Sequence, residues 1–251
     1  MVIDKKGQLQ HCARKIFAEK LRRAGFVSYN GEDLSWYRVV NHQVLHSVYL
    51  FSRLNTIPLF MSVGYGHHPL FIPAPIPQKL IFSDLWDDEV MQWVRKPDAQ
   101  CITYDGTWVM CHNTEEHGAE ILDADVFPVF GQVNTEEDAY RLHRAECVER
   151  IKLHGRRYPG GTMQIVGSEW LADEAIYFAD NEIQNIIIDQ LIRQKESMEK
   201  GNMASTPKRR EWYQLRIEAI QSGEREKFLM MLEARKKRFT RSLEKKLGIQ
   251  I

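Results

Sequence analysis

The residue types best suited to chemistry in this 251-residue chain are a tyrosine and two histidines that follow a run of β-forming residues. Tyr65, His67 and His68 end a glycine-containing stretch and precede Pro69. Histidine changes its charge near neutral pH, so it serves as an acid, a base or a metal ligand. Because loops at strand ends commonly carry function, these three residues are candidates for catalysis. The alternative is that they are surface residues in a proline-bounded loop.

Metal-ligating residue types also gather within seventeen positions, namely Cys101, Cys111, His112 and His117. Asp105-Gly106 lies between them and predicts a two-residue hairpin turn. With that turn, Cys101 pairs with Met110, and Cys111 points to the opposite face of the hairpin. One zinc ion cannot readily be bound from both faces at Zn–S distances of about 2.3 Å. We therefore predict no metal site and no cofactor.

One face of a predicted strand at residues 57–66 has few side chains. Side chains alternate along a strand, so Ser62, Gly64 and Gly66 share that face. Glycines within a strand often mark the close approach of another backbone or of a ligand. These three residues are candidates for ligand binding, and the alternative is that the first helix packs tightly against them.

A further candidate surface is basic and lies near the C-terminus. Residues 195 to 251 contain fifteen basic and eight acidic residues, whereas the whole chain has 34 of each, so the remainder has seven negative charges in excess. The candidate binding residues lie in a predicted helix and are Arg235, Lys236, Lys237, Arg238 and Arg241. Such a cluster can neutralise several phosphates together. The alternative is a solvated helix face that docks on the acidic remainder of the chain.

The elements that position these candidates begin with a helix and a sheet. Apolar residues at three- and four-residue spacing predict an amphipathic helix at residues 8–24, which Gly25 ends. Four antiparallel strands are predicted near residues 26–29, 34–40, 43–52 and 57–66. The turns between them are predicted at Asn30-Gly31, Asn41-His42 and Asn55-Thr56.

This region has a family resemblance. The helix, the Gly25-Phe26 step, a polar turn, the strand start Trp36-Tyr37-Arg38 and the strand at Ser62-Val63-Gly64 resemble an uncharacterised family of small bacterial domains of unknown function. The resemblance covers about residues 9–66. It implies a helix packed on an antiparallel meander and a bacterial source, and it implies no activity.

The rest of the chain is predicted to be mainly helical. Helices are predicted at residues 84–95, at 135–153 with a capping box of Asn134 and Glu137, and from Ser168 for about 27 residues. A break of the last of these at Asp180-Asn181 is an alternative. A short strand is predicted at 124–132 and another at 162–166. Residues 201–207 have linker composition, and helices follow at about 207–221 and 223–247 with Thr206 as the cap.

The predicted fold class is α+β, with an N-terminal helix on a four-stranded antiparallel meander, a further hairpin and helices, and a helical C-terminal extension. The predicted domains are residues 1–200 and 207–251. The sequence has no run of about 18 apolar residues and no apolar segment typical of a secretory signal. The four cysteines lack a C-x-x-C pair. These features predict a cytoplasmic protein without disulfides or a membrane partner.

No nucleophile elbow, phosphate loop, dinucleotide fingerprint or H-E-x-x-H motif occurs in the sequence, which argues against the familiar enzyme classes. The sequence favours a non-enzymatic binding or scaffold protein of a bacterial cytosol. It would contact a protein partner, or a second copy of itself, through its C-terminal helices. Two alternatives remain open: a nucleic-acid-associated protein that uses the basic C-terminal helices, and an enzyme with its site at the His67-His68 end of the sheet.

Overall fold

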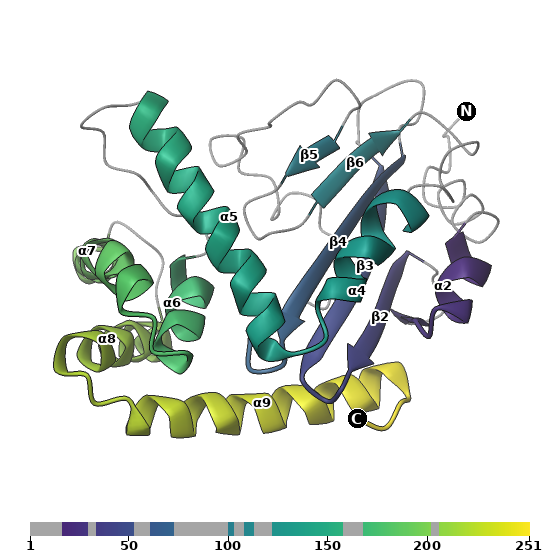
Figure 1. The fold of residues 1–251 in the computed structure, drawn as a ribbon. Coiled ribbons are helices and arrows are strands. Elements are labelled where there is room, and N and C mark those ends of the chain that lie inside the picture. The colour runs from purple at the N-terminus through teal and green to yellow at the C-terminus, as the bar shows by residue number, and fades with distance from the viewer. Residues whose placement is uncertain are drawn as a thin grey trace, which may run out of the picture. The chain divides into compact units, whose positions relative to one another are not determined.

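The computed structural model describes residues 17–29, 34–52, 61–72, 100–102, 108–112, 122–157, 168–201 and 206–251 (Figure 1). These residues divide into two compact units. The first unit contains the described residues of 17–70, 100–139 and 239–251, and the second contains 71–72 and those of 140–238. Within the described ranges, no helix combines the length and the apolar character needed to span a membrane.

The described residues of the first unit form a six-stranded antiparallel sheet with the order β1-β2-β3-β4-β6-β5. The strands are β1 (Val27–Ser28), β2 (Ser35–Val40), β3 (Val44–Ser52), β4 (Met61–Pro69), β5 (Gln100–Ile102) and β6 (Trp108–His112). The first four strands are the predicted meander. The hairpin of β5 and β6 extends the sheet beside β4, so the predicted α+β fold is confirmed.

The turn between β2 and β3 is where it was predicted. Asn41 and His42 both have positive φ angles, of 51° and 55°, and the Gln43 amide donates to the Val40 carbonyl oxygen at 3.0 Å. Asparagine tolerates this left-handed backbone better than most residues do. The connection also includes Gln43, one residue more than predicted, so Arg38 lies opposite His46 instead of Leu45.

The first hairpin differs from its prediction. A two-residue turn at Asn30-Gly31 would pair residue 29 with residue 32, but Ser28 lies opposite Trp36 and Val27 opposite Tyr37. The connection between β1 and β2 is therefore longer than predicted. The third predicted turn, Asn55-Thr56, lies outside the described residues.

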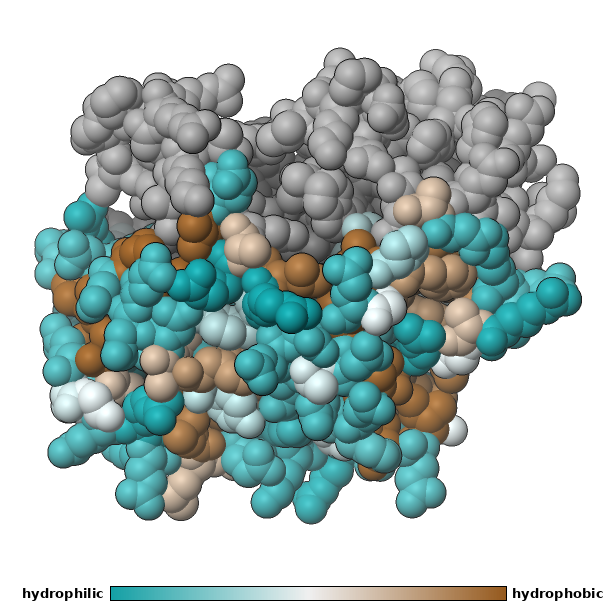
Figure 2. Space-filling view, viewed as in Figure 1, coloured by the Kyte–Doolittle hydropathy of each residue, from teal (hydrophilic) through white to brown (hydrophobic). Residues whose placement is uncertain are grey.

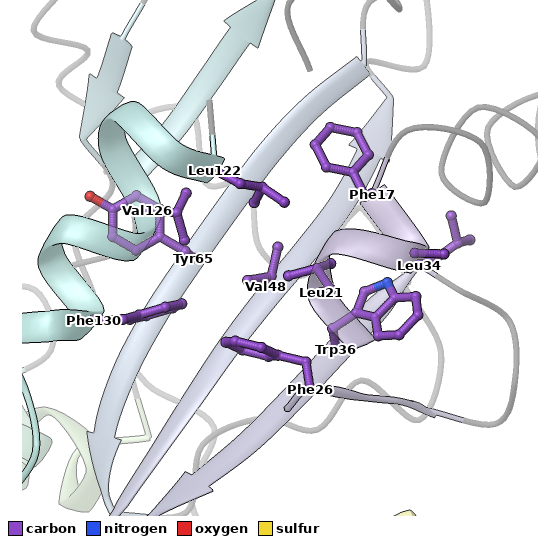
Figure 3. Packing of buried hydrophobic residues seen from close by; sticks show 11 residues of the cluster. Phe17, Leu21, Phe26, Leu34, Trp36, Val48, Tyr65, Leu122, Val126 and Phe130 are labelled. Atoms are coloured by element: carbon purple, nitrogen blue, oxygen red, sulfur yellow. The ribbon is translucent and has the colours of Figure 1, made fainter. Parts of the chain in front are cut away.

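One face of the sheet is covered by short helices. These are α2 (Glu19–Arg23), a π-helical turn η3 (Leu122–Val126) and α4 (Phe127–Gln132). Figure 3 shows Leu21 of α2 and Phe130 of α4 directed toward Trp36, Val48 and Tyr65 of the strands. The predicted C′ position after the first helix is confirmed, since Gly25 has a φ of 81°.

The prediction of a strand at residues 124–132 is wrong, because η3 and α4 occupy this segment. Valine and phenylalanine favour strands when considered singly. Leu122, Val126 and Phe130, however, recur every four residues and are all buried in the core over the sheet. That spacing is helical, and the contact with the sheet outweighs the local preference.

The opposite face of the sheet carries a second core within the first unit. Tyr37, Leu45 and Leu70 pack there with Leu243 and Leu247 from the end of helix α9 (Glu226–Leu247). The last residues of the chain join this core through Ile249 and Ile251.

The second unit is helical and has cores of its own. It contains most of α5 (Glu136–Arg157), α6 (Ser168–Tyr177), α7 (Asn181–Glu199), α8 (Pro207–Ser222) and the first half of α9. One core joins α5, α6, α7 and α8 around Leu171, Ile187 and Tyr213. Another joins Ile176, Leu215, Phe228 and Leu232 with Phe71.

The prediction of one continuous helix from Ser168 is wrong, and its alternative, a break at Asp180-Asn181, is confirmed together with the predicted cap at Thr206. Asp180 separates α6 from α7, and its side chain accepts a hydrogen bond from the Ile183 amide at 3.1 Å. Thr206 caps α8 in the same way, accepting from the Arg209 amide at 3.2 Å, and Pro207 occupies the first helical position. Each cap satisfies a backbone donor that lacks a partner inside its helix.

The start and end of α5 differ from prediction. The capping box consists of Thr135 and Asp138, because the Asp138 amide donates to Thr135 Oγ1 and Asp138 Oδ2 accepts from the Thr135 amide, both at 3.1 Å. The predicted box, Asn134 with Glu137, lies one residue too early. The helix also continues through Gly155 to Arg157 instead of ending near residue 153.

The predicted helix at 84–95 and strand at 162–166 lie outside the described residues. The predicted linker at 201–207 falls inside the second compact unit. The division into domains 1–200 and 207–251 stays a prediction.

Candidate functional site

The two candidate histidines are in a strand and not in a surface loop. β4 extends beyond its predicted end at residue 66, with His67 opposite His46 and His68 opposite Leu45. Their exposed fractions are 2% and 3%, and Tyr65 is equally buried in the core with Phe130. The predicted loop was wrong because β3 supplies partners as far as Pro69. Catalysis by Tyr65, His67 or His68 stays a prediction, and it would require a substrate to reach buried side chains.

A polar bridge that the sequence did not predict lies beside these residues. Arg38 donates to the Ala24 carbonyl oxygen at 2.8 Å, and its Nη2 lies 3.0 Å from His46 Nδ1. His46 Nε2 lies 2.8 Å from the Val133 carbonyl oxygen. A neutral ring that accepts at Nδ1 and donates from Nε2 satisfies both contacts. Burial lowers the pKa of His46 from 6.5, and the Arg38 charge lowers it further, to about 3.

The low pKa of His46 makes stability depend on pH. Between about pH 3 and pH 6.5 the unfolded chain binds a proton that the folded chain excludes, so stability is lost as the pH falls. From pH 7.5 to pH 5.0, we expect His46 to contribute a loss of about 2 kcal/mol in the free energy of unfolding. Urea titrations at both pH values measure it.

The controls are two glutamine substitutions. His46→Gln keeps a donor and an acceptor without a titratable ring and should remove about 2 kcal/mol of the pH dependence. His42→Gln changes an exposed turn residue and should leave the dependence intact. A His46→Gln variant with the full pH dependence would show that His46 does not titrate as described.

The glycine-containing face of β4 is the face toward the end of α9. Gly66 is buried and lies opposite Ser47, whose Oγ donates to the Gly66 carbonyl oxygen at 3.2 Å. Gly64 lies opposite Tyr49, and Ser62 opposite Phe51. Because Tyr65 belongs to the core under α2, alternation places Gly64 and Gly66 on the opposite face. The described part of the first helix, from residue 17 onward, therefore packs on the face that does not carry the glycines. Ligand binding at Ser62, Gly64 and Gly66 stays a prediction.

The hairpin that carries two of the cysteines has another register than predicted. Cys101 lies opposite Val109 instead of Met110, and Ile102 opposite Trp108. In this register, positions 101 and 111 fall on the same side of the hairpin, so the geometric argument against a shared metal was wrong. His117 lies outside the described residues. Among the residues that are described, no group of three or more histidine, cysteine, aspartate or glutamate side chains could hold a metal ion.

The remaining candidate is α9, whose apolar side is buried. Phe228 and Leu232 belong to a core of the second unit, and Leu243 and Leu247 to a core of the first. Gly248 follows the helix with a φ of 66°, and its amide donates to the Glu244 carbonyl oxygen at 2.9 Å. The burial of residues along its length sets which side of α9 faces the solvent.

Arg235 does not belong to the exposed side of α9. Its Nη2 donates to Asp173 Oδ2 and its Nε to the Phe71 carbonyl oxygen, both at 2.6 Å. Arg216 of α8 contacts the same carboxylate through Nε at 2.7 Å and Nη2 at 3.1 Å. Trp212 lies beside both guanidinium groups, at 4.8 Å from Arg235 and 5.7 Å from Arg216. Arg235 therefore fixes α9 inside the second unit, and Lys236 beside it is half-buried.

The exposed side of α9 carries a row of cations. We call Lys237, Arg238, Arg241 and Lys245 the basic row, because all four are exposed and follow one another at helical spacing. In Figure 2, hydrophilic side chains predominate along the lower edge, where Figure 1 places α9. No carboxylate in the described part of the chain forms an ion pair with these four residues.

The C-terminal half of α9 has a net positive charge. Residues 235–247 include seven basic residues and one acidic residue, Glu244. The Glu244 carboxylate accepts a hydrogen bond from the Ile251 amide at 3.1 Å. The four cations of the basic row form no ion pair with the carboxylates that the structure describes, which leaves them available to a polyanion.

Sequence reasoning missed the polar contacts between distant elements. Examples are Asp173 with Arg216, and His143 Nδ1 with Glu174 Oε1 at 2.8 Å. These partners lie more than 30 positions apart and leave no periodic signal. For Arg38 and His46 the available signal was nearly correct, since a two-residue turn at Asn41-His42 would place Arg38 opposite Leu45, one position from its observed partner.

Comparison with protein-family models, with curated proteins and with solved structures finds no match to this chain. The resemblance of residues 9–66 to a bacterial domain family stays a prediction.

Proposed function

We propose that the protein is a non-enzymatic binding protein that holds nucleic acid along the basic row of α9. One observation carries the proposal: Lys237, Arg238, Arg241 and Lys245 are exposed, while the apolar side of the same helix is buried within the chain. The surface that such a helix presents to a partner is charged and has little apolar area.

Phosphate groups are the partners that such a row fits best. Binding of cationic side chains to nucleic acid releases condensed counterions, which favours association at low salt. For each phosphate contact, the affinity at 0.1 M salt is about eightfold higher than at 1 M salt. Four contacts are enough for measurable binding without any pocket.

The other two predicted functions have less support. Contact with a protein partner or a second copy through α9 would use exposed apolar residues, but the one large hydrophobic residue exposed in the described ranges is Met230. An enzyme at His67 and His68 would act through side chains that are buried in the sheet. An acidic protein surface remains a partner that the test below distinguishes.

The proposed setting is the cytosol of a bacterium. The bacterial source rests on the resemblance of residues 9–66, and the cytosol rests on the cysteine pattern of the sequence. Cys147 is buried and forms no disulfide, which suits a reducing compartment.

Charge reversal on the basic row tests the proposal. Fluorescence anisotropy with a labelled 20-base-pair DNA of mixed sequence measures the affinity at 0.1 M salt. We expect Lys237→Glu/Arg241→Glu to bind about 60-fold more weakly than the unmodified protein, because two phosphate contacts are lost. Circular dichroism should be unchanged, since both side chains are exposed.

The matched control is Arg193→Glu/Lys200→Glu, which reverses one arginine and one lysine that are exposed on or next to α7. It should bind within about twofold of the unmodified protein. Equal losses in both variants would mean that only net charge matters, and an unaffected Lys237→Glu/Arg241→Glu variant would mean that α9 is not the binding surface.

A further inference from the structure

We infer that the partner of the basic row is double-stranded nucleic acid, held by its phosphate backbone without stacking of bases. This inference rests on the proposed function and names the form of nucleic acid. It follows from the absence of aromatic residues on the exposed side of α9 and from the helical spacing of the row.

The aromatic residues of α9 face inward. Phe228 is buried in a core of the second unit, and Phe239 packs against the core that includes Leu243 in the first. Among the residues that the structure describes, Met230 is the one large hydrophobic residue that is exposed, and no aromatic residue is. Proteins that bind single strands combine cations with aromatic side chains on which the bases stack, each stack contributing about 1–3 kcal/mol. The basic row has the cations alone.

The spacing of the row fits a rigid line of phosphates. Lys237, Arg241 and Lys245 repeat every four residues, and Arg238 lies next to them. At 1.5 Å per residue the row is about 12 Å long. Duplex DNA presents one charge for about each 1.7 Å of its axis, so about seven phosphate charges lie within that length. A duplex keeps these charges in place, whereas a flexible strand would lose conformational entropy to align with a helix.

The chemistry of the row suits the phosphate backbone. Arginine and lysine bind phosphates and can also read guanine, whereas adenine is read by asparagine or glutamine and cytosine by carboxylates. None of the four residues has an amide or a carboxylate group, so any sequence preference should be limited to guanine. Binding should then follow salt concentration with a slope of about −3.6 in log affinity against log salt, for four duplex phosphates.

The experiment measures anisotropy between 50 and 200 mM salt with three probes: a 20-base-pair DNA duplex, one of its strands alone, and polyglutamate as competitor. We expect the duplex to bind at least tenfold more tightly than the strand. Its affinity should fall about 150-fold over this salt range. Lys237→Gln/Arg241→Gln should reduce that fall to about 12-fold, and the control Arg193→Gln/Lys200→Gln should leave it near 150-fold.

The outcomes separate this inference from the proposed function. Equal or tighter binding of the single strand would overturn the inference and leave nucleic-acid binding intact. Binding of neither nucleic acid, or equal displacement by polyglutamate, would overturn the proposed function itself. If the salt slope of Lys237→Gln/Arg241→Gln equals that of the unmodified protein, the basic row is not the surface that binds nucleic acid.

Discussion

Replacement of Asp173 by asparagine is expected to lower the free energy of unfolding by about 3–5 kcal/mol. The Asp173 side chain is 0% exposed and accepts hydrogen bonds from both Arg216 and Arg235. Asparagine keeps the shape but removes the negative charge, so two guanidinium groups are left near each other without their common counter-charge. Since small proteins have only about 5–15 kcal/mol of stability, this single change removes a large part of it.

Urea unfolding followed by tryptophan fluorescence measures the effect, because Trp212 lies against both arginines. Asp189→Asn removes the same charge from an exposed position of α7 and should change stability by less than about 0.5 kcal/mol.

The triple variant Asp173→Leu/Arg216→Met/Arg235→Met replaces the ionic group by apolar side chains and should recover most of the loss. A loss below about 1 kcal/mol for Asp173→Asn would show that the arginines find other compensation.

Replacement of Phe130 by alanine is expected to cost about 3–5 kcal/mol, the usual range for a buried aromatic residue. Its ring stacks on His46 with centroids 4.3 Å apart. It also contacts the rings of Phe26 and Tyr65, each at 5.7 Å, and Figure 3 shows these three rings. Alanine would leave a cavity where α4 meets the sheet. Thermal and urea unfolding of the purified variant measure the loss.

A second readout distinguishes this core role from a general effect on the helix. Loss of the ring lets water approach His46, so its pKa should rise toward 6.5 and the pH dependence of stability should decrease. Phe127→Ala, at a half-buried position of the same helix, should cost less and leave that pH dependence unchanged. If both substitutions cost the same, Phe130 is not the centre of this core.

Much of the fold could be predicted because its signals are local. Asn41-His42 and the Thr206-Pro207 pair each act on residues within a few positions and were found where expected, and Asp180 caps a helix at the break that was given as an alternative. The α+β class is predicted in the same way, because apolar residues alternate in the strands and recur every three or four positions in the helices. Segment 124–132 could not be assigned by this reasoning, because its helical spacing includes Leu122 outside the segment and depends on contact with Trp36 and Val48.

The candidate site could be predicted only in part. The composition of α9 predicted a basic helix, but it grouped Arg235 with Lys237 and Arg238. The structure separates them, because Arg235 turns inward to Asp173. His67 and His68 show the same limit, since their burial depends on pairing with β3, which is distant in sequence.

The sequence by itself determined that the end of this chain forms helices with an excess of positive charge, because composition and period are properties of neighbouring residues. Only the tertiary structure decided which cations reach the solvent. The burial of Phe228, Leu232, Leu243 and Leu247 sets the rotation of α9, and that rotation leaves Lys237, Arg238, Arg241 and Lys245 exposed. The rotation of α9 about its axis depends on contacts with residues that are distant in the sequence, so it cannot be predicted from a local pattern.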